Sequence, residues 1–392
     1  QHQLLADFAR EQLGENTIPF VDVALYYQQF AERNRTNYPA LRPEWENLMA
    51  GMQLAHRLNQ WPLVISYAET LTQAWFVRAR YGQARQGYRL ASEAAQAAGD
   101  EQAVASALLH GGKAALEQND YQEASRQLSE SVRLYQRLED EAGIASAQYY
   151  LGRIAIEQGD FEHAATLLAS SQHLREQLED VAGVAAVLYQ EAFLFYRRSN
   201  LAQAKVLCER ALIMQEALAD QAGLLPTLRL LADIALEQAE YDIAEMHLQR
   251  CLTLCMSLQD RGELAATYYS LAIVAINQDK LDQAETYVAN ALELSQLMGN
   301  RQFQAMALYS QCWIHAKRSE FALAIENGQK SLVAFRELQD NFNLVYVLCY
   351  LGDFYRDSQQ PDQARTLWQE ASTIAQKLNH PLLDALKERF VA

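Results

Sequence analysis

The residues of this chain with the most chemistry to offer form two rows that recur at steps of 40 residues. The first row reads Leu109, Tyr149, Tyr189, Arg229, Tyr269, Tyr309 and Cys349, and the second, four residues later, reads Lys113, Arg153, Phe193, Asp233, Ile273, Trp313 and Asp353. Tyrosine, tryptophan and arginine provide stiff, amphipathic contact area and dominate the energetic centres of protein interfaces. The rows therefore predict binding of a partner by Tyr149, Arg153, Tyr189, Arg229, Asp233, Tyr269, Tyr309 and Trp313. The alternative is that these tyrosines pack between neighbouring helices with only their hydroxyl groups exposed.

Patterns that are typical of catalysis or metal binding are incomplete in this sequence. The run Gly111-Gly112-Lys113 resembles part of a phosphate-binding loop, but Ala107 replaces the required glycine and Ala114 replaces the serine or threonine that would hold magnesium. Cys251 and Cys255 share one helical face, yet no histidine or carboxylate recurs beside them at metal-site spacing. We therefore expect no catalytic residues, no metal site and no cofactor, and we do not expect this chain to be an enzyme.

A period of 40 residues runs through most of the chain and must position these rows. A fixed period of this size is typical of a solenoid, in which one repeat cannot bury its apolar face alone. Small alanines allow paired helices to approach closely, and an aspartate before a helix can accept a hydrogen bond from an unpaired amide. The recurring residues are Ala84, Ala124, Ala164, Ala204, Ala244, Ala284, Ala324 and Ala364, and Asp100, Asp140, Asp180, Asp220, Asp260, Asn300 and Asp340.

Each repeat is expected to hold a first helix, a turn of about three residues and a second helix. First helices are expected near 61–79, 102–118, 142–158, 182–198, 222–238, 262–278, 302–318 and 342–358. Second helices are expected near 81–98, 121–138, 161–178, 201–218, 241–258, 281–298, 321–338 and 361–378. The fold class is all-α, a right-handed α-solenoid of about eight helix-turn-helix units.

The repeat array is expected to span 61–392, after a helical linker or capping segment over 1–60 that does not obey the period. Short helices are expected there at 2–13, 18–33 and 44–58. Within the array, we expect Pro226 to delay or kink its helix, because proline lacks the backbone N–H and crowds the preceding turn. Leucines in the row that includes Leu138 are expected to supply the apolar contact onto the next repeat.

Composition narrows the classes of partner. Half of the residues are hydrophobic and the formal net charge is −16, without a cluster of Lys and Arg. Direct nucleic-acid binding depends on cations that neutralise phosphates, so we do not expect it. No apolar run approaches the roughly 20 residues needed to cross a bilayer. The five cysteines fit packing better than disulfide chemistry, which favours a reducing cytoplasm. The chain begins at Gln1, and we expect it to be a piece of a longer protein.

The pattern Leu151-Gly152, Ala155, Gly159-Asp160-Phe161, Ala164, Leu168 and Ser171 resembles the tetratricopeptide repeat, in its 40-residue variant. The resemblance covers about four-fifths of the chain, from Trp61 to Leu378. It implies a superhelical array whose first helices line a concave groove, and the two rows above lie on those helices. It is specific for fold and unspecific for function.

The non-repeating start looks like the segment that follows the winged-helix module in bacterial STAND-type signal-transduction ATPases, whose switch domain is NB-ARC- or NACHT-like. The elements that match are His2, Leu4, Phe8 and Leu13, and then Glu46-Asn47-Leu48 and Trp61. This resemblance implies an ATPase domain upstream in the same protein, with the present chain as its sensor arm.

The expected function is a non-catalytic repeat scaffold that binds a protein, a peptide or a small effector in its concave groove. Effector binding would then favour one arrangement of the array against the upstream switch. Two alternatives stay open: a stand-alone adaptor for protein complex assembly, and the interaction domain of a repeat-coupled enzyme such as a protease. The sequence upstream of Gln1 would distinguish the three.

Overall fold

The computed structural model of this protein describes residues 18–258, 260–298, 300–338, 340–378, 380 and 382–390, which include helices and turns and no strand. The chain divides into two compact units, 1–200 and 201–392. The helix expected at 2–13 lies outside the described residues. The N-terminal helices are α2 (Ile18–Arg33), α3 (Tyr38–Leu41) and α4 (Trp45–Arg57), with a short 3₁₀ turn at Arg42–Glu44.

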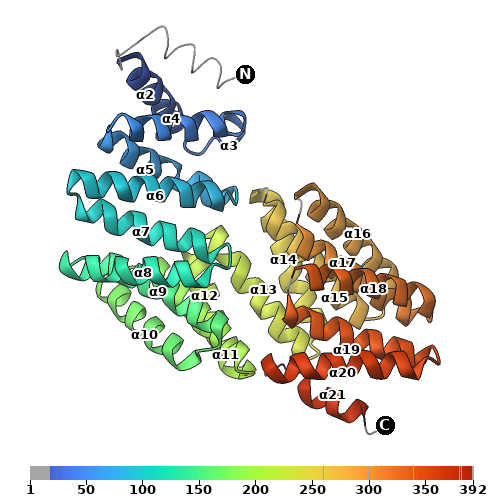
Figure 1. The fold of residues 1–392 in the computed structure, drawn as a ribbon. Coiled ribbons are helices and arrows are strands. Elements are labelled where there is room, and N and C mark those ends of the chain that lie inside the picture. The colour runs from blue at the N-terminus through green and yellow to red at the C-terminus, as the bar shows by residue number, and fades with distance from the viewer. Residues whose placement is uncertain are drawn as a thin grey trace. The chain divides into compact units, whose positions relative to one another are not determined.

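Within each unit, each helix of the array packs beside its neighbour in sequence, as Figure 1 shows. The first unit continues with α5 (Trp61–Val77), α6 (Tyr81–Ala98), α7 (Glu101–Leu116), α8 (Tyr121–Arg137), α9 (Glu141–Gln158), α10 (Phe161–Gln177) and α11 (Val181–Arg197). The second holds α12 (Leu201–Ala217), α13 (Gln221–Glu237), α14 (Tyr241–Leu258), α15 (Arg261–Asn277), α16 (Leu281–Met298), α17 (Arg301–Lys317), α18 (Phe321–Glu337), α19 (Asn341–Asp357), α20 (Pro361–Leu378) and α21 (Leu383–Arg389). The expected all-α repeat array is confirmed, and its helix bounds agree with the periodicity to within about three residues.

The recurring aspartates begin the first helices as expected. The side chain of Asp140 accepts a hydrogen bond from the amide of Gly143 at 2.9 Å, and Asp340 does the same with Asn343 at 3.1 Å. Such an N-cap bond satisfies an otherwise unpaired amide and contributes about 1 kcal/mol to the helix. Equivalent bonds are made by Asp100, Asp180, Asp220, Asp260 and Asn300, and Asp120 and Asp160 cap second helices.

The ends of the helices are equally regular. Every twentieth residue from Asn59 to Gln359, wherever the structure describes that position, has a positive φ between 50° and 79°. The amide that follows bonds back across the last turn, as Asp120 N does to the carbonyl of Ala115 at 3.0 Å. This left-handed closing residue is a common helix stop. Among the described twentieth positions only Gly99 and Gly159 are glycine, so at the other described positions larger residues adopt the same turn geometry.

The packing within a hairpin is explained by small residues that face large ones. The recurring alanines, from Ala84 to Ala364, are all fully buried. Sixteen residues separate a second pair of positions, where Gly112 faces Leu128 and Gly352 faces Trp368. The order reverses in one hairpin, where Cys312 faces Gly328 with its sulfur 3.1 Å from where a Cβ would stand. Cys312 therefore packs as a small hydrophobic residue, as the sequence indicates.

Two expectations fail in part in the structure. Pro226 does not delay its helix, because α13 begins at Gln221 directly after the Asp220 cap and runs through the proline. The only helical bond that the proline removes is to Ala222, an exposed residue whose carbonyl can bind water. The prediction that the leucine row makes apolar contacts with the next repeat was also wrong in part, since Leu178 and Leu218 are each 43% exposed at the ends of their helices.

The structure also contains a helix that the sequence reasoning missed. The array was expected to hold about eight repeats, yet α21 occupies the first-helix position of a further one. His380 lies one step of 40 beyond Asp340, and its Nδ1 accepts a hydrogen bond from the amide of Leu382 at 3.1 Å. Ala385 likewise continues the step from Ala305 and Val345. The period therefore carried the signal for this helix.

Candidate functional site

The two rows lie on the first helices, and we call the surface that they form the first-helix face. In the first unit, Tyr149, Arg153 and Tyr189 are half-buried on α9 and α11. Arg153 donates to Glu117 of the preceding first helix at 3.1 Å. The guanidinium of Arg175, on α10, lies 5.7 Å from the centre of the Tyr149 ring. The first-helix face of this unit is therefore an ordered layer of tyrosines and paired cations.

In the second unit the same rows place Arg229, Asp233, Tyr269, Tyr309 and Trp313 on α13, α15 and α17, all half-buried. Burial raises the pKa of both tyrosines above the ordinary value for a phenol. The charge of Asp233 raises the pKa of Tyr269 further, and that of Tyr269 acts on Tyr309. Tyr269 is therefore within electrostatic reach of both Asp233 and Tyr309.

Trp313 is surrounded mainly by aromatic side chains of its own helix and of the next first helix. Its ring lies 4.8 Å from that of Tyr350 and 5.3 Å from that of Phe354, both edge to face, and 6.5 Å from Tyr309. Such aromatic pairs add roughly 0.5–1.5 kcal/mol beyond the area they bury. Packing between neighbouring first helices, the alternative considered for the tyrosines, therefore describes the surroundings of Trp313.

The surroundings of Asp233 disfavour the charged form of its carboxyl group. Burial raises the pKa of its carboxyl group to about 6, Glu237 acts in the same direction, and Arg229 opposes them. Arg229 is held by Glu263, to which its Nη1 donates at 2.7 Å. Among the described residues, no cation forms an ion pair with Asp233.

The repeat supplies a comparison for Asp233. Asp353 lies in the same row, three repeats later, and accepts two hydrogen bonds from Arg389, at 2.8 and 2.7 Å. Arg389 follows Asp353 by 36 residues, as Tyr269 follows Asp233. Arg389 therefore continues the first row one step past Cys349. The sequence reasoning missed it because the row was not extended beyond Leu378.

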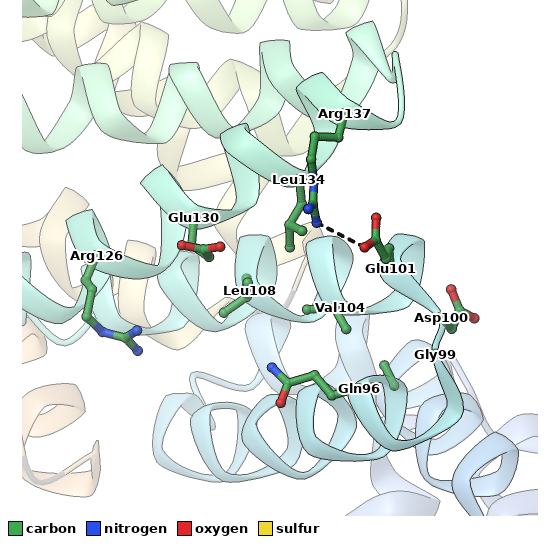
Figure 2. Close-up of a pocket in the computed structure, with 11 residues that line it drawn as sticks. Gln96, Gly99, Asp100, Glu101, Val104, Leu108, Arg126, Glu130, Leu134 and Arg137 are labelled. Atoms are coloured by element: carbon green, nitrogen blue, oxygen red, sulfur yellow. Dashed lines mark hydrogen bonds and ion pairs between the residues drawn. The ribbon is translucent and has the colours of Figure 1, made fainter.

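A hollow of about 540 Å³ lies on the first unit, away from the rows. Figure 2 shows its lining, from α6, α7 and α8, with apolar Val104, Leu108 and Leu134 between charged side chains such as Arg137, which is paired with Glu101. Its origin can be read from the repeats. Tyr135 fills the equivalent space one repeat later, over Gly143, whereas Ala95 and Ala103 are both small. Two small residues at one junction leave the space unfilled.

We expect Asp233→Asn to stabilise the protein near neutral pH. The folded state raises the pKa of this carboxyl group from 3.8 to about 6, so it binds the proton more tightly than the unfolded chain does. Stability contributed by this group is therefore present below about pH 4 and is lost as the pH rises through 6. The asparagine variant avoids that loss, which we expect to be about 1–2 kcal/mol at pH 7.5 after allowance for partial exposure.

Chemical denaturation from pH 4 to 8 measures this difference. Asp362→Asn is the matched control, because Asp362 is exposed on α20. A difference between Asp233→Asn and the parent that does not grow with pH would contradict the assignment.

These features define a tetratricopeptide-like helical repeat array whose first helices, within each unit, carry a face of aromatic and charged side chains. No helix in the described parts of the chain is long and apolar enough to cross a membrane. The same residues contain no group of three or more His, Cys, Asp or Glu side chains that could hold a metal ion.

Comparison with solved structures places the chain among arrays of this kind. It resembles the STAND protein with a tetratricopeptide repeat sensor from Pyrococcus horikoshii, with a TM-score of 0.66 and 14% identity over 98% of this chain and 57% of that one. It also resembles aspartyl phosphate phosphatase F from Bacillus subtilis, with a TM-score of 0.61 and 12% identity over 91% of this chain and 94% of that one. For the Rap conjugation gene regulator of plasmid pLS20, in complex with the Phr* peptide, the TM-score is 0.58 and the identity is 11%, over 84% of this chain and 96% of that one.

At these identities the likeness establishes the fold. The chain spans 57% of the length of the Pyrococcus protein. No protein-family model matches the sequence, and no curated protein matches it.

Proposed function

We propose that this protein is a non-catalytic repeat module that binds a peptide or an extended protein segment on its first-helix face. The observation that carries the proposal is that Asp233, Tyr269 and Tyr309 lie on successive first helices that contact one another, α13, α15 and α17, each half-buried and each with a polar group. Half-buried tyrosines combine apolar area with hydrogen-bonding capacity and lose little conformational entropy on binding. The plasmid pLS20 regulator supports the proposal, because an array of the same fold holds a peptide there.

The role of the whole protein is the finer part of the proposal. We infer that the chain is the sensor arm of a STAND-type regulator, with an ATPase domain upstream. Support comes from the Pyrococcus protein, which carries a tetratricopeptide sensor and over which nearly the whole of this chain aligns. A peptide or small effector would act by binding one arrangement of the array more tightly than another. A nucleotide-binding motif in the sequence upstream of Gln1 would support this role, and its absence would favour an adaptor.

Catalysis in this chain is not part of the proposal. The Bacillus subtilis protein of similar fold is named as a phosphatase, so the fold alone does not decide whether such an array is catalytic. The non-catalytic role rests on the residues of the face itself, where Arg153 and Arg229 are engaged in ion pairs and the tyrosines have raised pKa values that disfavour proton transfer near pH 7.

Selection from a random heptapeptide library tests the binding proposal. We expect the wild-type protein to enrich a family of peptides, and Tyr269→Ala to bind a synthetic member of that family at least about tenfold more weakly, equivalent to about 1.4 kcal/mol. Tyr287→Ala is the matched control, because Tyr287 is also half-buried but lies on a second helix, α16. Fluorescence anisotropy measures the affinities. Equal affinity of Tyr269→Ala and Tyr287→Ala would refute the assignment of the first-helix face.

A further inference from the structure

We propose that Asp233 anchors a cationic side chain, arginine or lysine, of the peptide ligand, with the ring of Tyr269 beside it. This inference rests on the proposed function and specifies the chemistry of one subsite. It starts from the internal comparison between Asp233 and Asp353, which occupy the same position in their repeats and differ in what faces them.

The end of the array shows what this position accepts. The Arg389 guanidinium binds both carboxylate oxygens of Asp353 and lies 5.7 Å from the centre of the Tyr350 ring. This two-bond geometry is the strongest that a carboxylate makes with a side chain. The carboxylate at this repeat position therefore binds a guanidinium group where the chain supplies one.

At Asp233 the described part of the chain supplies no such cation. The residue at the position equivalent to Arg389 is Tyr269, and the nearby Arg229 is bound to Glu263. Glu237 lies one turn further along α13 and adds negative charge. The repeat therefore presents a carboxylate without the cation that its equivalent has.

The surroundings of Asp233 suit a cation in two further ways. Tyr269 is within electrostatic reach of both Tyr309 and Tyr346, and the negative faces of aromatic rings attract guanidinium and ammonium groups. An unpaired carboxylate that is partly removed from water also costs stability, which the raised pKa of Asp233 reflects. A ligand cation would relieve that cost on binding, whereas an anionic or apolar group would not.

The test uses the random heptapeptide library and three proteins: the wild type, Asp233→Asn and Asp233→Lys. We expect wild-type selection to enrich arginine or lysine at one fixed position of the peptide family. Asp233→Asn should lose this enrichment while still selecting peptides, and Asp233→Lys should favour aspartate or glutamate there. Asp362→Asn, which removes the same charge from an exposed position of α20, should select as the wild type does.

A pair of synthetic peptides gives the quantitative readout. One carries the selected arginine and the other carries citrulline, which has nearly the same shape without the charge. Calorimetry should show that citrulline weakens binding to the wild type roughly ten- to hundredfold, since hydrogen bonds between charged groups are the strongest class. Against Asp233→Asn the two peptides should bind with similar affinity.

The possible failures separate the two proposals. Enrichment of peptides without a basic position, or an arginine preference that persists in Asp233→Asn, would overturn the cation subsite and leave peptide binding intact. Absence of any peptide enriched by the wild type over Tyr269→Ala would overturn peptide binding and the subsite with it.

Discussion

Gly352→Ala is expected to destabilise the protein by about 1–3 kcal/mol, the usual cost of forcing a methyl group into a packed core. A Cβ at this position would lie 2.6 Å from Cδ1 of Trp368. The indole cannot move away freely, because Trp368 is 5% exposed and its Nε1 donates to the carbonyl of Cys349 at 3.0 Å. Displacing the ring would leave the indole N–H buried without a partner.

Chemical denaturation of the variant and the parent measures the effect. Gly262→Ala is the matched control, since a Cβ there would meet only Asp260 Oδ1, at 3.4 Å, in the first turn of α15. Alanine favours helix over glycine by about 1 kcal/mol, so the control is expected to be neutral or stabilising. If Gly352→Ala were as stable as Gly262→Ala, the proposed complementarity between small and large residues across the hairpin would be wrong.

The second large effect is expected for Asp353→Asn, at about 2–4 kcal/mol. The two side chains of the Asp353–Arg389 pair are only 14% and 18% exposed, so the variant leaves a guanidinium largely out of water without its counterion. Arg389 ends α21, and the pair is that helix's charged link to α19. We therefore expect amide hydrogen exchange in Leu383–Arg389 to accelerate in this variant more than elsewhere in the second unit.

Asp233→Asn provides the comparison, since the same substitution at the equivalent position of another repeat should have the opposite sign near neutral pH. The reason is that Asp353 has a cation bound to it and Asp233 has none among the described residues. Destabilisation of similar size in both variants would show that the row position, and not the ion pair, determines the cost. Unchanged exchange in α21 would show that Arg389 does not hold that helix in place.

Much of this fold follows from the sequence because the repeat averages out local ambiguity. A single aspartate before a helix is a weak signal, but Asp100, Asp140 and their equivalents recur at one step and all cap helices. Pro226 was misjudged because local propensity was given more weight than the tertiary packing of α13, which holds the helix in place despite one missing bond. Leu178 was misjudged because recurrence was taken as evidence of burial, although the end of a helix can recur and stay exposed.

The candidate site could be predicted only in part. The rows identified Asp233 and Tyr269, because side chains at one repeat position share one face. The pairs that connect neighbouring repeats could not be read from rows at steps of 40. Arg153 with Glu117, and Arg389 with Asp353, are each separated by 36 residues, an offset that depends on how adjacent helices are displaced along their axes. The three-dimensional structure was needed to distinguish a paired carboxylate from an unpaired one.

The left-handed residue that ends a helix at each described twentieth position from Asn59 to Gln359 limits how such a chain can change its length. One residue added at a connection would rotate the side chains of the next helix by about 100° about its axis. The recurring alanine of that helix would then face solvent. Gain or loss of a whole 40-residue block would keep the recurring alanines of all remaining repeats at their buried contacts. Natural variants of this protein should therefore differ in size by complete hairpins, and binding surfaces would be gained or lost one block at a time.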